Sequence, residues 1–292
     1  MTTQKNIRSR SKPLTNMFGF TLLFCFLVVF VIFSFSNSLF VKNKDRINIV
    51  VQTKERMTYY SISTKDDVNY LIYFNPDSKL IAPGGYQYYR FGALAKLAHL
   101  DKKPEVLKKA FSSATSSFID YYFYPPDPPV LYGSSVSEQV HFPSFEELFW
   151  YSSNANVLDR LYLYFRFLSS AKPHFNVLPS PKLVEDYAKS YQGFFYNRTY
   201  RKERKLVQII YTKKYETADL ISRILEGNGI QVVDVSYEKK SYNICLVVEN
   251  SDRFSKTASD LADFFSCKLQ KGKTGTFDIL FMLGNREDDW EA

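Results

Sequence analysis

The stretch from Phe18 to Val41 contains no charged residue, and it constrains the chain more than any other feature. An α-helix rises about 1.5 Å per residue, so roughly 20 apolar residues cross the hydrocarbon core of a bilayer. The stretch is apolar all round, with no polar face that could contact water. A buried core helix is the alternative, but purely apolar runs in such helices seldom exceed about 14 residues. The sequence therefore predicts a transmembrane helix over residues 18–41.

The flanking charges predict how this helix is oriented. The leader, residues 1–17, carries four basic side chains and no acidic one. Lys and Arg are enriched on the cytoplasmic side, so we expect a cytoplasmic leader and a single-pass protein of the cell membrane, with everything after residue 41 outside. A cleaved signal peptide is the competing interpretation, but its apolar region is about 7–15 residues long and ends at a small-residue cleavage site. The run here is longer and such a site is poor, which favours an uncleaved anchor.

The remaining charge argues against nucleic acid as a partner. The net charge is +8, and four of these charges lie in the leader. The rest of the chain has no long Lys/Arg tract, unlike a surface that binds nucleic acid. Its length and its hydrophobic content of 45% suit two folded domains outside the membrane.

The cysteines leave two interpretations open. Cys25 lies in the apolar stretch, whereas Cys245 and Cys267 lie in the exported part. Those two could form a disulfide, but a domain of this size does not need one, and buried free thiols are the favoured interpretation. The three histidines are scattered and no paired Cys motif occurs, so a zinc site is not expected.

Residues 46–195 have the pattern of an α/β domain whose second half is helical. A glycine turn over 83–90 precedes an amphipathic helix, and Pro104 begins the next helix. Ser144 and Glu147 have the spacing of a capping box, which marks a further helix start. Strands are expected at 46–52, 69–74 and 119–124.

The last part of the chain has the clearest pattern. Residues 205–284 alternate as β-α-β-β-α-β, which predicts a small α+β domain with two helices on one face of a four-stranded sheet. Residues 196–204 form the linker before it. This stretch is basic and could contact phosphate groups, but a solvated linker is favoured. Residues 285–292 are an acidic tail that we expect to be loose.

This last domain resembles the C-terminal domain of the LytR–CpsA–Psr family of envelope proteins. The resemblance covers the segment LVQIIYT, the helix and strand ADLISRILEGNGIQVVDV, the strand YNICLVVEN, the helix KTASDLADFF and the closing FDILFMLG. The upstream part is more faintly similar to the family's α/β/α main domain, through a strand that ends in Asn-Pro and through GGYQYYRFGALAKL. The resemblance implies an α/β main domain followed by an α+β domain.

The resemblance also implies what chemistry to look for. Enzymes of this family transfer lipid-linked glycopolymers through a pyrophosphate, which is held by arginines and by acids that bind Mg²⁺. The family's Arg-Thr-Asp-like element and its later arginine-rich motif have no counterpart here, so no catalytic residue is carried over. Arg90, with Gly84 and Gly85, is the best candidate for a phosphate contact. Asp66 and Asp67 are the best candidates for metal ligands, with solvated loop charge as the alternative.

These observations favour a membrane-anchored, exported envelope protein without catalysis. Its expected partners are the membrane, a peptidoglycan or lipid-linked glycopolymer, and other envelope proteins, with no cofactor. The alternative is a divergent phosphotransferase that uses Mg²⁺ to attach lipid-linked glycopolymers to peptidoglycan. A DNA-binding regulator is excluded if the folded part lies outside the membrane.

Overall fold

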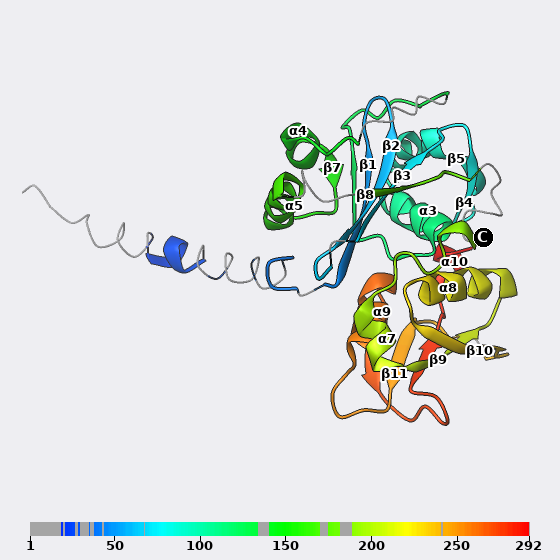
Figure 1. The fold of residues 1–292 in the computed structure, drawn as a ribbon. Coiled ribbons are helices and arrows are strands. Elements are labelled where there is room, and N and C mark those ends of the chain that lie inside the picture. The colour runs from blue at the N-terminus through cyan, green and yellow to red at the C-terminus, as the bar shows by residue number, and fades with distance from the viewer. Residues whose placement is uncertain are drawn as a thin grey trace, which may run out of the picture.

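The structure is a computed structural model with two mixed α/β domains that pack against each other (Figure 1). The first, the main domain, extends from residue 44 to about residue 195, and the C-terminal domain follows it. The structure describes residues 19, 21–26, 29, 35, 38–42, 44–66, 68–133, 140–169, 175–181, 189–240 and 242–291.

The main domain is built on a six-stranded mixed sheet. Its strands are β1 (Arg46–Gln52), β2 (Met57–Ser63), β3 (Asn69–Phe74), β6 (Tyr121–Tyr124), β7 (Ser152–Ser153) and β8 (Phe175–Leu178). They lie in the order β7-β6-β1-β2-β3-β8, so β1 and β2 are central. Every residue of β2 is buried, including its polar ones. The Ser61 hydroxyl, for example, donates to Asn48 Oδ1 at 2.7 Å, which satisfies a polar group that would otherwise be costly to bury.

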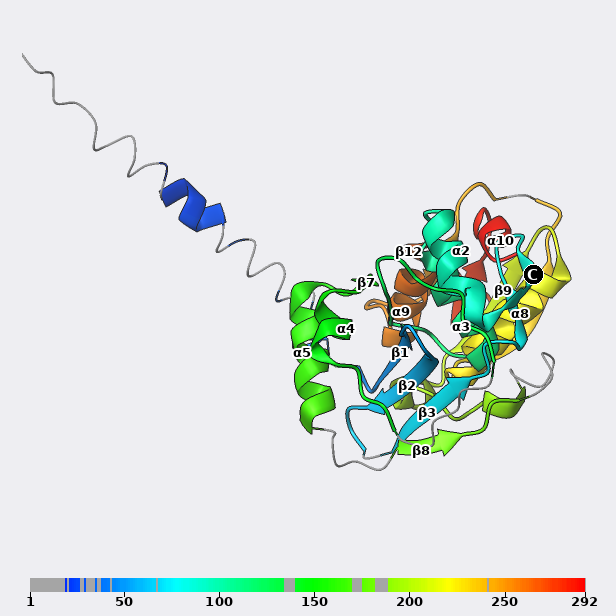
Figure 2. The same cartoon turned by 90° about the horizontal axis from the view of Figure 1, so that it is seen from above.

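Helices cover both faces of this sheet (Figure 2). The elements on one face are the hairpin of β4 (Lys79–Ala82) and β5 (Gln87–Arg90), the short helix η1 (Phe91–Ala93), α2 (Leu94–Leu100) and α3 (Glu105–Thr115). The opposite face is covered by α4 (Phe145–Phe149) and α5 (Val157–Ser169). Aromatic rings fill the first layer, where Phe74 stacks on Phe91 at 4.4 Å between ring centroids. The predicted capping box is confirmed at the start of α4.

The C-terminal domain has one strand more than the sequence predicted. Its elements are β9 (Leu206–Tyr211), α8 (Tyr215–Gly227), β10 (Gln231–Tyr237), β11 (Leu246–Glu249), α9 (Lys256–Phe265), β12 (Lys268–Lys271) and β13 (Ile279–Met282). The sheet order is β10-β9-β13-β11-β12. Although β10 and β11 are consecutive, they do not pair, because β9 and β13 lie between them. Helices α8 and α9 lie between this sheet and the main domain (Figure 1).

Cys245 and Cys267 form a disulfide, so the favoured interpretation of free thiols is wrong. Cys245 directly precedes β11 and Cys267 directly precedes β12, and these two strands are parallel neighbours. The pairing brings their Cα atoms to 4.8 Å, which lies within the range that a disulfide requires. The sequence did not indicate the pairing because β12 was not predicted.

The predicted transmembrane helix is also wrong on this structure. In the described part of the chain, no helix is long and apolar enough to cross a membrane. Much of the stretch 18–41 lies outside the described residues. Its last described part, residues 38–41, is a turn that packs on the main domain instead of continuing a helix. There Leu39 is 4% exposed, and its backbone N–H donates to Asp159 of α5 at 2.7 Å.

Two short helices outside the predicted pattern join the domains. The expected linker contains α7 (Arg198–Glu203), and the tail contains α10 (Arg286–Asp289). Asp45, just before β1, accepts hydrogen bonds from the backbone and the hydroxyl of Thr199 at 2.8 and 2.6 Å. Trp290 is 2% exposed and packs on Phe265 of α9, so the tail is ordered by the core and is not loose.

Candidate functional site

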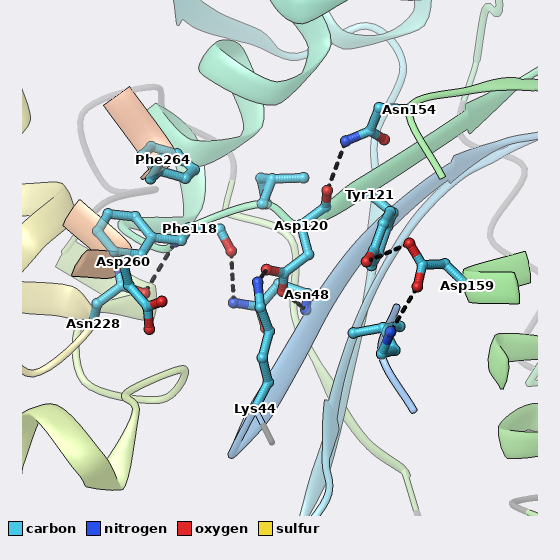
Figure 3. Close-up of polar contacts among 12 residues, drawn as sticks. Lys44, Asn48, Phe118, Asp120, Tyr121, Asn154, Asp159, Asn228, Asp260 and Phe264 are labelled. Carbon is cyan, nitrogen blue, oxygen red and sulfur yellow. Dashed lines mark hydrogen bonds and ion pairs between the residues drawn. The ribbon is translucent and has the colours of Figure 1, made fainter. Parts of the chain in front are cut away.

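A polar cavity of about 170 Å³ lies where the two domains meet. Residues of β1 and of the segment before β6 line it from the main domain, and α9 lines it from the C-terminal domain (Figure 3). The cavity has room for several water molecules or for one phosphate-sized group.

On the main-domain side, a lysine and an aspartate form a fixed ion pair. Lys44 pairs with Asp120, whose other carboxylate oxygen accepts from the backbone N–H of Asn48 at 2.8 Å (Figure 3). Burial alone would lower the pKa of Lys44, but the charge and hydrogen bond of Asp120 outweigh it, and the pKa is raised. Lys44 therefore stays protonated, and both carboxylate oxygens of Asp120 are occupied, one by Lys44 and one by the Asn48 N–H.

A second pair lies on the side of the C-terminal domain. Lys256 Nζ is 2.7 Å from Asp260 Oδ1, and the Tyr200 hydroxyl donates to Asp260 Oδ2 at 2.8 Å. Burial and the neighbouring Asp260 raise the pKa of Tyr200 well above its ordinary value, so its hydroxyl keeps its proton. Both oxygens of Asp260 are thus occupied.

Lys108 of α3 differs from these lysines because it forms no ion pair within the described part of the chain. Its ammonium group donates to the backbone oxygen of Phe264 at 3.2 Å and lies 4.1 Å from the centroid of that ring. Burial lowers the pKa of Lys108 to about 8, and the charge of Asp120 offsets only part of this effect. The cavity therefore contains a cation that an incoming anion would stabilise.

Outside the cavity, α7 carries a cluster of exposed cations that we call the α7 basic surface. It consists of Arg198, Arg201, Lys202 and Arg204, which line a surface hollow together with Tyr196. The guanidinium carbon of Arg201 lies 3.4 Å from the centre of the Tyr196 ring, which fixes that side chain by a cation–π contact. Since α7 also contributes Tyr200 to the cavity, the two features share one helix.

Asp66, a predicted metal ligand, connects the α7 basic surface to the cavity. Its carboxylate pairs with Arg198, and its other oxygen lies 3.9 Å from Arg46, which lines the cavity. Burial alone would raise the pKa of Asp66, but hydrogen bonds from Ser63 and Val68 and the charges of both arginines lower it. In the structure Asp66 therefore orients two arginines.

Arg90, the predicted phosphate contact, lies elsewhere and has other partners. It ends strand β5, and its Nη2 donates to Asp77 Oδ1 at 2.6 Å and to the Leu131 carbonyl at 3.2 Å. Its guanidinium carbon lies 4.6 Å from the centre of the Tyr132 ring. These contacts hold the loop around residue 131 against the β4–β5 hairpin.

The two glycines beside Arg90 belong to a hairpin turn. Gly84 and Gly85 have φ values of 93° and 85°, which only glycine adopts freely. The N–H of Gly84 donates to the Glu291 carbonyl at 2.8 Å, so the turn contacts the end of the chain. Asp67 lies outside the described residues. Within the residues that are described, no group of three or more His, Cys, Asp or Glu could hold a metal ion.

Sequence reasoning missed the cavity because its charged residues come from distant segments. Lys44 precedes β1, Lys108 lies in α3 and Lys256 begins α9, and no sequence motif connects them. The α7 basic surface did leave a signal, the basic run at 196–205, but a solvated linker was favoured there. Among the described residues, nine cationic side chains line the cavity and this surface. Three lining carboxylates and Asp66, which pairs with Arg198 and Arg46, oppose them.

Comparisons with known proteins gave matches among solved structures. No protein-family model and no curated protein matches the chain. The chain is similar to the LytR-CPS2A-psr family protein YwtF (TagT) with bound octaprenyl pyrophosphate lipid, at 12% identity and a TM-score of 0.24, over 84% of this chain and 86% of that one.

Two further matches are to the same protein. TagT of B. subtilis is 13% identical, with a TM-score of 0.25, over 85% of this chain and 88% of that one. TagT bound to LI-WTA is 12% identical, with a TM-score of 0.25, over 84% and 87% of the two chains. The first of these structures is named as a protein of the LytR-CPS2A-psr family, and all three have a TM-score of 0.25 or less.

Proposed function

We propose that this chain is an exported envelope protein that binds a phosphate-bearing glycopolymer at the junction of its two domains without cleaving it. The observation that carries the proposal is the excess of cations over carboxylates in the cavity and on the α7 basic surface. An anionic polymer is the ligand class whose charge such a surface complements.

The cavity takes one phosphate group of the polymer. Lys108 has no carboxylate partner among the described residues, and its pKa near 8 leaves it mostly protonated at neutral pH. A phosphate beside Lys108 supplies an opposite charge, which stabilises the protonated form that burial disfavours. Charge-assisted hydrogen bonds of this kind are about twice as strong as neutral ones.

Neighbouring phosphates of the polymer lie on the α7 basic surface. Arginine presents a planar fork of donors that matches two oxygens of one phosphate, and three of the four cations there are arginines. Asp66 and Tyr196 orient Arg198 and Arg201 in advance, which reduces the side-chain entropy lost on binding. A chain of phosphates is therefore bound by several contacts at once.

Binding without cleavage is supported by the state of the acidic groups. Two of the three acidic residues that line the cavity, Asp120 and Asp260, each hold a lysine and a second donor, so neither is placed to accept a proton from a nucleophile or to ligate Mg²⁺. The third, Asp263, is exposed. Phosphoryl transfer depends on positioned metal ions and a group that orients the nucleophile.

A location outside the cytoplasm is supported by the disulfide. Disulfides persist in oxidising compartments and are rare in the cytosol, where thiols are kept reduced. The Cys245–Cys267 bond therefore favours export, as the resemblance to envelope proteins implies.

The test uses the purified full-length chain with a poly(glycerol phosphate) teichoic acid, measured by calorimetry at low and at physiological ionic strength. We expect binding that weakens with salt, and none to neutral dextran. The double variant Arg201→Glu, Lys202→Glu should bind at least about tenfold more weakly, since each charge-assisted contact contributes about 1.5–3 kcal/mol. The matched control, Lys239→Glu with Lys240→Glu, makes the same charge change in an exposed turn.

Three results would overturn the proposal. Equal losses in both double variants would mean that only net charge matters. No binding at either salt concentration would point to a protein partner instead. Cleavage of a polyprenyl-pyrophosphate glycan in the presence of Mg²⁺ would establish the divergent phosphotransferase.

A further inference from the structure

A second hollow between the domains has a different chemical character. It encloses about 410 Å³ between the β4–β5 hairpin of the main domain and the first turns of α8. It shares no lining residue with the interdomain cavity or with the α7 basic surface.

Two exposed tyrosines flank this hollow, one from each domain. Tyr88 on β5 is 59% exposed, and Tyr215 at the start of α8 is 54% exposed. They differ in this from most aromatic residues of the chain, which pack in the cores. The row of rings continues from Tyr215 to Tyr211, at 6.0 Å between centroids, and from there to the exposed Tyr237 at 5.7 Å. An aromatic surface thus extends beyond the hollow along the C-terminal domain.

The polar groups of the hollow suit hydroxyls rather than phosphates. Glu216 and Asp219 contribute two carboxylates, and Arg223 contributes one guanidinium group, which pairs with Asp219 at 3.2 Å. The net charge of the lining is therefore negative, so it repels the anionic polymer that the α7 basic surface attracts. Carboxylates and the Gln87 amide are acceptors and donors that hydroxyl groups can satisfy.

The backbone at Gln87 has an uncommon conformation. This residue has a φ of 56°, in the left-handed region that non-glycine residues seldom adopt. Gln87 lines the hollow, next to Tyr88.

We propose that this hollow binds a neutral saccharide chain, with sugar rings against Tyr88 and Tyr215. The apolar faces of sugar rings pack against aromatic side chains, while their hydroxyls bond to Glu216, Asp219 and Gln87. The remaining tyrosines, Tyr211 and Tyr237, extend the platform for further sugar units. This site is distinct from that of the proposed anionic polymer, so one chain holds two kinds of envelope glycan together.

The test titrates the full-length chain with two neutral tetrasaccharides, cellotetraose and chitotetraose, by calorimetry and by saturation-transfer NMR. We expect at least one of them to bind. Tyr88→Ala and Tyr215→Ala should each weaken binding about tenfold, whereas Tyr88→Phe, which keeps the ring, should retain it. Trp150→Ala is the matched control, because Trp150 is another exposed aromatic residue, at 71%, on α4's C-terminal side.

The outcomes separate this inference from the proposed function. Failure of both tetrasaccharides to bind, or binding that Tyr88→Ala and Tyr215→Ala leave unchanged, would overturn it. A loss of binding equally large in Trp150→Ala would also do so. Binding of the teichoic acid by the tyrosine variants should be unchanged, which shows that they fold and that the two sites are independent.

Discussion

A glycine, Gly227, lies at a close contact between the two domains, and its substitution tests the interdomain architecture. Gly227 is the last residue of α8 and packs on Ser116, which ends α3. A Cβ placed on Gly227 would lie 1.9 Å from the Ser116 backbone oxygen, whereas real Cβ contacts stay beyond 3.0 Å. In Gly227→Ala the two backbones must therefore separate by about 1 Å.

The expected cost follows from three contributions. Overpacking of a buried contact costs about 1–3 kcal/mol. The separation also stretches the hydrogen bond from the Phe118 N–H to Asn228 Oδ1, now 3.0 Å, which is worth about 1 kcal/mol. Alanine is favoured over glycine in a helix by about 1 kcal/mol, which offsets part of this loss. We expect Gly227→Ala to lower the free energy of unfolding by about 1–3 kcal/mol.

The measurement is urea unfolding followed by tryptophan fluorescence. Trp290 is 2% exposed and reports on the C-terminal domain. The matched control is Glu226→Ala, an exposed position one residue earlier on the same helix, where a change within about 0.5 kcal/mol is expected. Both Phe118 and Asn228 line the interdomain cavity, so Gly227→Ala should also weaken binding of the teichoic acid.

A stable Gly227→Ala variant would refute this reasoning. If its unfolding free energy and its polymer affinity both equalled those of the wild type, α3 and α8 could not be in the contact described. Equal destabilisation by Glu226→Ala would instead show that the loss arises within the helix.

Three further predictions concern pH and the disulfide. Affinity for the teichoic acid should fall as pH rises through about 8, where Lys108 loses its proton, and Lys108→Met should remove this step in a calorimetric pH series. Cys245→Ser with Cys267→Ser should lower the free energy of unfolding by about 3 kcal/mol, measured in urea, because the chain between them is no longer closed into a loop of 22 residues. Burial would raise the pKa of Asp45, but hydrogen bonds from Lys65 and Thr199 lower it. Ionised Asp45 therefore stabilises the folded state at pH values above the ordinary carboxyl pKa of about 3.9. This stabilisation is lost as the pH falls through the lowered pKa of the folded state. In Asp45→Asn, the free energy of unfolding measured in urea should fall less between neutral and acid pH than in the wild type.

Local chemistry was enough to predict many individual elements. The strand at 46–52 and the cap at Ser144 occur as expected. These features depend on residues within one or two turns, so neighbouring side chains decide them. The central strand β2 was not predicted because it is buried on both faces and contains polar residues. It therefore lacks the alternation of apolar and polar residues that marks a half-buried strand. Its Thr58 and Ser61 are fully buried, and their environment is supplied by other strands.

The tertiary structure decided the features on which function depends. The sequence by itself determined the first five elements of the C-terminal domain, in the order β-α-β-β-α, and the basic run at 196–205, because periodicity and local charge are properties of short segments. It could not determine the separation of β10 from β11, the Cys245–Cys267 bond or the cavity around Lys108. Each of these depends on which segments, distant in the chain, become neighbours when the two cores bury their apolar faces.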